Sequence, residues 1–429
     1  MKELPLQPQK TTFCNLMISF HRFQLSNGLK VIVHQDYTTP IVALNVLYNV
    51  GARDEKPEKT GFAHLFEHLM FGGSKNIPRY DEPLERVGGE NNAFTSNDVT
   101  SYYITIPEPN LETAFWLESD RMLDLAFSKK SLEVQRNVVM EEFRQTHLNQ
   151  PFGDAWLLLR PLAYHVHPYR WSTIGADINH IAHATMDDVK DFYSRFYNPN
   201  NAILCVAGPV EVQKIKDLSE KWFGDIPPGP PNNRQLPPEP AQTAARTMHV
   251  ERDVPCNAIY KAWHIPDRLS QRYYTADLIS DVLSAGESSR LYVELVKKRQ
   301  LFSDISAYIT GNLDPGLLVI SGKLMNGTSM EIAENAIQEA IEKLQEEPVN
   351  GRELQKVKNR IESMLVFTEI KVLEKALNLS MYELLGDADM INHEISKYSE
   401  VDAEEISNFA REFLIPGNCS SLYYQMKSK

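Results

Sequence analysis

Residues 61–73, GFAHLFEHLMFGG, decide how the rest of the chain is interpreted. No Gly or Pro interrupts residues 62–71, so the sequence predicts a helix there. On such a helix His64 and His68 lie one turn apart on one face, and Glu67 shares an arc of about 100° with them. Two imidazoles at this spacing can hold one zinc ion, and a carboxylate beside them can take a proton from a zinc-bound water.

A plainer interpretation treats the two histidines as residues on the polar face of an amphipathic helix. The helix is apolar nearly all round, with Phe62, Leu65, Phe66, Leu69, Met70 and Phe71. A helix of this kind is usually buried. Buried imidazoles and a buried carboxylate cost several kcal/mol unless they are paired or bind a metal, so the metal site is favoured.

Length, composition and charge limit the classes of function. The chain has 429 residues, enough for two or three domains, and 42% of them are hydrophobic, as in ordinary soluble globular proteins. The formal net charge of −13 argues against a nucleic-acid partner, because phosphate binding needs a basic surface. No run approaches the ~18 apolar residues of a membrane span, so no membrane partner is expected.

The N-terminus and the cysteines indicate the compartment. Residues 1–20 have no continuous apolar core and no small-residue cleavage site, unlike a secretory signal. Met17 precedes the first strand-like run, so residues 1–16 are expected to be a flexible extension or a mis-set start. The four cysteines lie far apart and form no C-x-x-C motif, so we expect reduced thiols in a cytoplasmic protein.

Hydrophobic periodicity predicts an α+β architecture. Hairpins are expected at residues 21–34 and 91–106, each with a turn rich in Ser, Asn, Gly or Asp. Strands are expected at 41–50 and 200–207, and helices at 81–87, 110–126, 129–147 and 186–196. This order predicts helices packed on a mostly antiparallel sheet.

A proline-rich segment divides the chain near its midpoint. Residues 227–240, PPGPPNNRQLPPEP, predict an extended and fairly stiff linker. It separates a first domain at 17–226, which carries the candidate zinc site, from a second domain at 241–429.

The second domain repeats the first. A shift of 217 residues aligns Val189, Phe192, Phe196, Pro199 and Asn201 with Ile406, Phe409, Phe413, Pro416 and Asn418. A shift of 214 residues replaces the two histidines and Glu67 by Leu278, Val282 and Asp281. The favoured interpretation is a duplicated domain whose second copy has lost its metal ligands, and the alternative is a chance similarity between two amphipathic helices.

A third zinc ligand must come from elsewhere in the chain, because catalytic zinc usually has three protein ligands and a water. The best candidate segment is 135–143, QRNVVMEEF, where Glu141 and Glu142 follow an apolar run. Exposed glutamates are common on helices, so the segment by itself leaves the choice between the two open.

Taken together, these motifs resemble the pitrilysin (insulinase) family of zinc peptidases, whose inverted H-x-x-E-H motif defines the inverzincins. The chain is most similar to the two-domain branch typified by the mitochondrial processing peptidase. Residues 88–95, 116–122 and 167–175 also resemble family segments. The similarity covers most of residues 20–225 and, more weakly, the second half. It implies an α+β fold of two homologous domains that form half of a clamshell.

The resemblance implies a zinc endopeptidase that hydrolyses peptides or unfolded polypeptide segments. One Zn²⁺ per chain would be held by His64, His68 and Glu142, with Glu67 as the base. Gln135 and Glu141 would lie beside the metal without binding it. An extended peptide would pair with an edge strand formed by Asn92, Ala93, Phe94 and Thr95.

Two segments depart from the family pattern. Gln135 stands where many members have a second Glu near the metal, and it cannot supply that charge. In the second domain, Val296 and Ser303 stand where the family has an Arg and a Tyr that hold the substrate. We therefore expect a heterodimer in which a homologous subunit supplies the Arg/Tyr pair, or else a homodimer in which Lys297 or Arg299 takes over.

Two further functions remain as alternatives. One is a non-catalytic structural subunit of the same fold, although such subunits have typically lost the motif that this chain keeps. The other is a peptide-binding module in which zinc is only structural, which would have four protein ligands and no open position.

Overall fold

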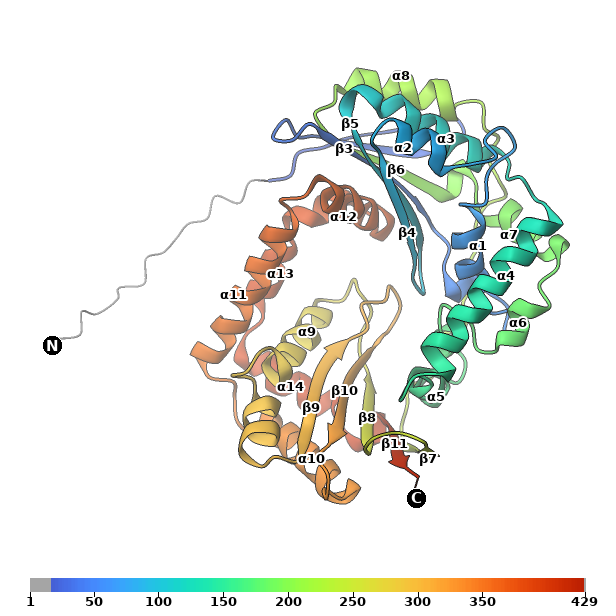
Figure 1. The fold of residues 1–429 in the computed structure, drawn as a ribbon. Coiled ribbons are helices and arrows are strands. Elements are labelled where there is room, and N and C mark those ends of the chain that lie inside the picture. The colour runs from blue at the N-terminus through green and yellow to red at the C-terminus, as the bar shows by residue number, and fades with distance from the viewer. Residues whose placement is uncertain (1–16, 428–429) are drawn as a thin grey trace, which may run out of the picture.

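The computed structural model describes residues 17–427 of the 429-residue chain and contains two sheets with helices packed on them (Figure 1). The expectation for residues 1–16, with Cys14, falls outside this range. Cys205, Cys256 and Cys419 are free thiols within it. Between residues 17 and 427, none of the helices combines the length and apolar character that a bilayer span requires.

The first sheet has the strand order β1-β2-β6-β3-β5-β4 and is antiparallel except where β2 pairs with β6. Both predicted hairpins form, as β1–β2 and β4–β5, and β4 lies at the edge. The strands are β1 (His21–Gln24), β2 (Lys30–Gln35), β3 (Ile41–Tyr48), β4 (Glu90–Thr95), β5 (Thr100–Pro107) and β6 (Ala202–Gly208).

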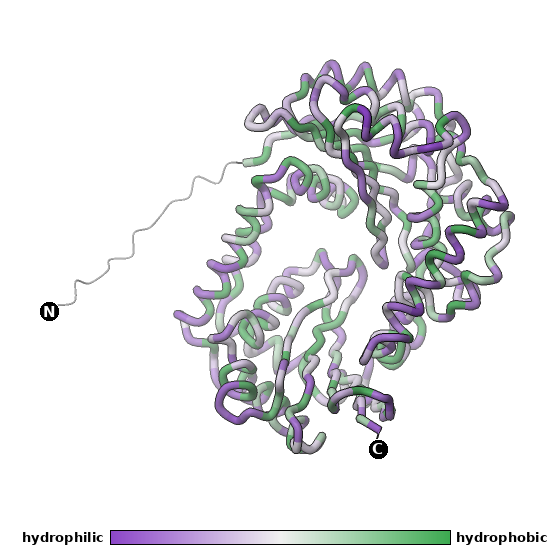
Figure 2. The backbone as a smooth tube through the Cα atoms, in the orientation of Figure 1, coloured by the Kyte–Doolittle hydropathy of each residue, from purple (hydrophilic) through white to green (hydrophobic). Residues whose placement is uncertain are grey.

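Most helices of the first half pack on one face of this sheet and form its main core. Helix α5 is the exception, because its buried residues pack with strands of the second half. Figure 2 shows hydrophilic residues along the outer turns of α8 and hydrophobic residues on the strands beneath it. The helices are α1 (Phe62–Leu69), α2 (Asp81–Arg86), α3 (Leu111–Leu123), α4 (Lys129–Phe143), the π-helix η3 (Arg144–Leu148), α5 (Ala155–Ala163), α6 (Ile178–Ala182), α7 (Met186–Phe196) and α8 (Val212–Phe223).

The second sheet has the order β7-β11-β8-β10-β9, again with a single parallel pairing, between β7 and β11. Its strands are β7 (Arg246–Arg252), β8 (Ala258–His264), β9 (Phe302–Ile309), β10 (Leu317–Leu324) and β11 (Cys419–Met426). The helices of this half are α9 (Gln271–Ser284), η6 (Tyr292–Lys298), α10 (Met330–Glu346), α11 (Gly351–Thr368), α12 (Val372–Leu385), α13 (Glu394–Glu400) and α14 (Ala403–Phe413). Residues 227–240 form neither helix nor strand, as a linker requires.

The two halves are structural copies, which confirms the α+β duplication. The bounds of α7 and α14 differ by the 217 residues of the sequence repeat, and a capping box begins each of these helices. The side-chain amide of Asn201 donates to the Phe196 carbonyl at 2.8 Å, and the side-chain amide of Asn418 donates to the Phe413 carbonyl at 2.9 Å. Chance similarity between two helices does not explain matched sheet topology and matched hydrogen bonds.

Each half contributes one helix that packs on the sheet of the other half, and we call this arrangement the helix exchange. Leu379 of α12 packs with Ala43 and Ile203 on the face of the first sheet that its own helices leave free. Leu159 of α5 packs in the same way with Ala262 and residues of β10 and β11 on the second sheet. Since α5 and α12 both begin at equivalent positions of the repeat, the exchange is reciprocal. Each sheet is therefore closed by the other half.

Two predicted helices extend beyond the α-helices of the structure. The helix predicted over 62–71 ends at Leu69, and the Phe71 N–H bonds to the His68 carbonyl (3.2 Å) in a turn. Gly73 then adopts a left-handed φ of 96°, which ends the helical path. The helix predicted over 129–147 is α-helical only as far as Phe143 and continues as the π-helix η3.

The reciprocal exchange makes a stability prediction. Leu159→Ala and Leu379→Ala should each lower the free energy of unfolding by about 2–5 kcal/mol, because both side chains are fully buried. Leu269→Ala is the control, because Leu269 is 59% exposed, and it should change stability by less than about 0.5 kcal/mol. Urea denaturation measures the difference. An interior variant as stable as the control would contradict the proposed contacts.

Candidate metal centre

The packing of α1 against α4 brings three predicted ligands together. The Nε2 atom of His64 lies 3.7 Å from Glu142 Oε1, and that of His68 lies 3.5 Å from Glu142 Oε2. One ligand atom from each residue lies within 4.8 Å of the others. Among residues 17–427, these three form the one group of His, Cys, Asp and Glu side chains with this closeness.

The donor set fits zinc. Two imidazole nitrogens and a carboxylate oxygen are the ligands of many catalytic zinc sites, and each must be deprotonated to bind. Burial lowers the pKa of His64, which favours the neutral ring. The hydrogen bond from His68, with the charges of the neighbouring histidines, lowers the pKa of Glu142, which favours the carboxylate.

The N-terminus of α1 is held by a residue that the sequence analysis missed. Glu55 is buried, and its carboxylate accepts hydrogen bonds from the Gly61 and Ala63 N–H groups, both at 2.8 Å. Gly61 has no side-chain cap of its own and adopts a φ of 87°, so Glu55 serves as the cap. Burial raises the pKa of Glu55, whereas the two N–H donors act in the opposite direction. A single Glu in a charged loop gives no local signal of this role.

The opposite side of α1 rests on aromatic rings. Phe66 stacks on Phe192 and Tyr197 with ring centroids 5.1 and 5.0 Å away. The Tyr102 hydroxyl, on β5, donates to the Phe66 carbonyl at 3.3 Å. These fully or nearly fully buried contacts fix the helix that carries both histidines.

An open pocket of about 340 Å³ joins the candidate ligands to the edge strand. His64, Glu67 and Glu142 line it, together with three of the four predicted strand residues, Ala93, Phe94 and Thr95. Asn92 is on the same strand outside the lining, and its side-chain oxygen accepts from the Ala93 N–H at 2.8 Å. The pocket also contains residues that the sequence analysis missed, namely Thr146, His147, Thr173 and Ile174.

Two residues predicted beside the metal lie elsewhere on α4. Glu141 is 54% exposed and interacts with Arg144 (3.3 Å) and Gln145 (3.2 Å). Gln135 is half-buried, two turns before Glu142 on the same helix. Their influence on the metal remains a prediction.

The second-half positions named in the sequence analysis have ordinary structural surroundings. Val296 packs against the core of this half, and the Ser303 hydroxyl donates to the Lys323 carbonyl at 3.2 Å. Arg299 is ion-paired with Glu339 at 2.6 Å, and Lys297 is exposed.

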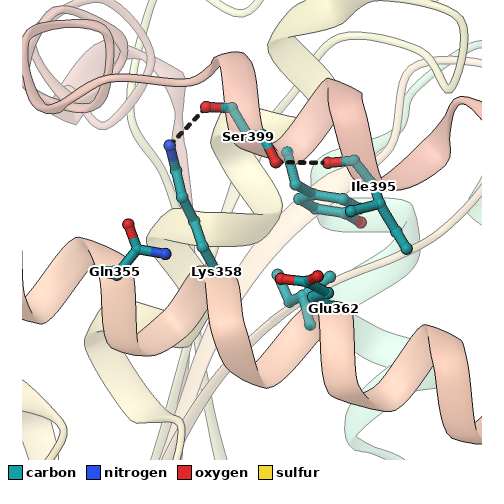
Figure 3. Close-up of a pocket in the computed structure, with 7 residues that line it drawn as sticks. Gln355, Lys358, Glu362, Ile395 and Ser399 are labelled. Atoms are coloured by element: carbon teal, nitrogen blue, oxygen red, sulfur yellow. Dashed lines mark hydrogen bonds between the residues drawn. The ribbon is translucent and has the colours of Figure 1, made fainter. Parts of the chain in front are cut away.

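A smaller cavity of about 170 Å³ lies in the second half, between α11 and α13 (Figure 3). The Lys358 amine donates to the Ser399 carbonyl at 2.8 Å, and the Ser399 hydroxyl donates to the Ile395 carbonyl at 3.0 Å. The polar groups shown here are thus partly satisfied by the protein, and the lining contains no His or Cys. This cavity therefore lacks the imidazole and thiol groups that bind zinc.

Known proteins are similar to this chain in sequence and in fold. A family model described as insulinase (peptidase family M16) matches residues 30–155, and one described as the inactive domain of peptidase M16 matches residues 183–361. The zinc protease PqqE of Helicobacter pylori is 34% identical over 343 residues, which cover 78% of this chain and 76% of that protein. The probable mitochondrial-processing peptidase subunit beta of Arabidopsis thaliana is 24% identical over 68% of this chain and 57% of its own length. The crystal structure of a protease from Helicobacter pylori has a TM-score of 0.89 at 28% identity, covering 95% of this chain and all of its own.

The Glu55 cap gives a second prediction. Glu55→Ala should lower the free energy of unfolding by about 2 kcal/mol and weaken zinc binding, because two N–H groups at the start of α1 lose their acceptor. Glu55→Gln keeps a carbonyl acceptor and should lose less. Glu58→Ala, an exposed residue of the same loop, is the control. Urea unfolding and zinc titration against a chelator measure both effects, and equal behaviour of the two Ala variants would refute the capping role.

Proposed function

This chain belongs to the insulinase family of peptidases (family M16), and we propose that it is a zinc-dependent endopeptidase acting on peptides or unfolded polypeptide segments. One observation carries the proposal: His64, His68 and Glu142 converge on one point, in a pocket that also contains Glu67 and the edge strand β4. The pocket is open, as access by a polypeptide requires.

The candidate ligands and Glu67 have separate roles in this proposal. A zinc ion held by the two histidines and Glu142 would supply an acidified water and polarise the substrate carbonyl. Glu67 accepts the proton of the attacking water and delivers it to the leaving amine. The buried wall behind α1 keeps the carboxylate and imidazoles in fixed positions, so little reorganisation is needed during reaction.

The substrate main chain pairs with β4. As an edge strand, β4 has one side without a partner strand, and an extended peptide can add to that side. The Ala93 N–H now bonds to the side chain of Asn92, which must turn away when a peptide binds. Main-chain pairing makes few demands on side chains, so the expected substrates share an extended backbone more than a sequence.

We assign this chain to the zinc-bearing half of a two-chain enzyme, with a homologous subunit as its partner. Val296 and Ser303 cannot supply the charge and the phenol of the family's Arg/Tyr pair. The homodimer alternative has less support, because Arg299 is already paired with Glu339 and only Lys297 remains exposed.

A non-catalytic subunit would have no need for Glu67 beside three converging ligands. A purely structural zinc would need a fourth ligand, and the described residues offer three.

Glu67→Gln should retain about one zinc per chain and lose peptide hydrolysis by at least about 10²-fold, because the amide cannot accept the proton. His68→Ala should lose both zinc and activity, since one of the three ligands is removed. Metal analysis and hydrolysis of a fluorogenic peptide measure the two properties. Retained turnover in Glu67→Gln would remove Glu67 from the role of base.

The two-chain arrangement is tested by mixing. A homologous chain with Arg and Tyr at the positions of Val296 and Ser303 should raise peptide hydrolysis by about 10²-fold, the scale of adding an oxyanion donor. The same partner with both residues changed to Ala is the control and should give little increase. If the chain alone is as active as the mixture, the heterodimer hypothesis is wrong.

A further inference from the structure

The backbone changes form directly after the third candidate ligand. Helix α4 ends at Phe143 and continues as the π-helix η3, whose wider turn shifts the direction of the side chains that follow. Such insertions are frequent at functional sites. Here the shift brings His147 into the lining of the pocket that contains Glu67 and Glu142. His147 lies outside the group of three converging ligands, so its ring is available for another role.

One hydrogen bond fixes the orientation of the His147 ring. Its Nδ1 atom lies 2.9 Å from the Gly153 carbonyl oxygen. A carbonyl only accepts, so Nδ1 carries the proton, and in the neutral ring Nε2 is left as an acceptor. The ring also packs edge-on against Phe143, with centroids 5.3 Å apart. The free nitrogen therefore has a defined direction.

The turn that presents the Gly153 carbonyl is closely constrained. Phe152 adopts a φ of 65°, which is rare for a residue with a side chain. A Cβ on Gly153 would lie 2.7 Å from the Thr146 carbonyl oxygen and 2.8 Å from that of His147, so only glycine fits. The Phe152 ring packs on Tyr424 of the second half, with centroids 5.2 Å apart. Unusual backbone of this kind persists only where its surroundings hold it, and here the second half does so.

We propose that His147 binds the substrate main chain, with Nε2 accepting a hydrogen bond from a peptide N–H. This inference rests on the proposed function. A peptide that pairs with β4 satisfies the backbone groups on one of its edges and leaves the other edge facing the pocket. An N–H that loses water there without a partner weakens binding, so an acceptor on the pocket wall strengthens it. His147 supplies that acceptor from this chain, whatever a partner subunit contributes.

Two substitutions separate substrate binding from local structure. His147→Asn keeps a short amide that can donate to Gly153 and removes the group at the Nε2 position. His147→Gln places an amide oxygen near that position. His183→Asn is the matched control, because exposed His183 makes the same kind of bond, from Nδ1 to the Asn179 carbonyl at 2.9 Å, outside the pocket.

The test is made in zinc-loaded Glu67→Gln, so that binding is measured without turnover. Fluorescence anisotropy with a labelled, unstructured peptide should show affinity about tenfold weaker for His147→Asn, the scale of one hydrogen bond. His147→Gln should stay within about threefold and His183→Asn within about twofold of the parent, all with unchanged zinc content and melting temperature. In the active enzyme, KM should rise more than kcat falls.

Each contrary result has one meaning. If His147→Asn binds peptide as tightly as the parent, His147 does not contact substrate. If the zinc-loaded parent binds no peptide although the unaltered chain hydrolyses it, the inference about His147 is wrong while the proposed function stands. If His147→Asn loses its zinc, His147 belongs to the metal site and the proposal is wrong. Failure of the proposed function is distinguishable, because it would appear as retained hydrolysis in Glu67→Gln or as an absence of zinc in the unaltered chain.

Discussion

The contact between α1 and α4 is the constraint on which the site depends. The spacing of His64 and His68 follows from one helical turn, whereas Glu142 reaches them only because two helices distant in sequence pack together. The contact is close: a Cβ on Gly72, just after α1, would lie 2.7 Å from the Ser131 hydroxyl on α4. Well-packed cores allow little relative movement. The positions of the three donors are therefore set by the apolar core, before any ligand binds.

Largely buried ion pairs hold the turn next to the edge strand β4 in place. Arg53 lies 3.0 Å from Asp98, in the turn that follows β4, and 2.8 Å from Asp314 in the second half. Asp98 also accepts from the Leu313 N–H at 3.0 Å. The hydrogen bond from His167 and the charge of Arg53 lower the pKa of Asp314 to about 2, so the pair is charged across the neutral range. The strand expected to bind peptide is thus anchored to the domain that carries no metal ligands.

Features written in local patterns were predictable from the sequence. The hairpin turns, the apolar helix with its two histidines, and the 217-residue repeat all depend on residues close together or on periodicity. The choice of Glu142 came from the family resemblance, because Glu141 and Glu142 are alike as isolated residues and only packing turns one toward the histidines.

Other features have no local signal. Glu55 lies in a charged stretch that reads as solvated loop, yet it is buried against the start of α1. The position of His147 depends on a π-turn and on a distant Tyr424. The exchange of α5 and α12 depends on which sheet face each helix covers, and an amphipathic pattern does not specify its partner. Sequence patterns indicate which side chains are buried, but only the tertiary structure shows which elements they pack against.

The exchanged helices make each copy depend on the fold of the other. Two copies that each cover the other's sheet have the arrangement of a domain-swapped dimer carried on one polypeptide. The second copy has Leu278 and Val282 at the positions aligned with the two histidines, so metal binding at this place puts no constraint on it. Its fold is still constrained, because α12 closes the sheet that supports the other copy's site. A half separated from the other would expose a wide apolar sheet face, so the second copy can differ in its chemistry only as long as its fold is kept.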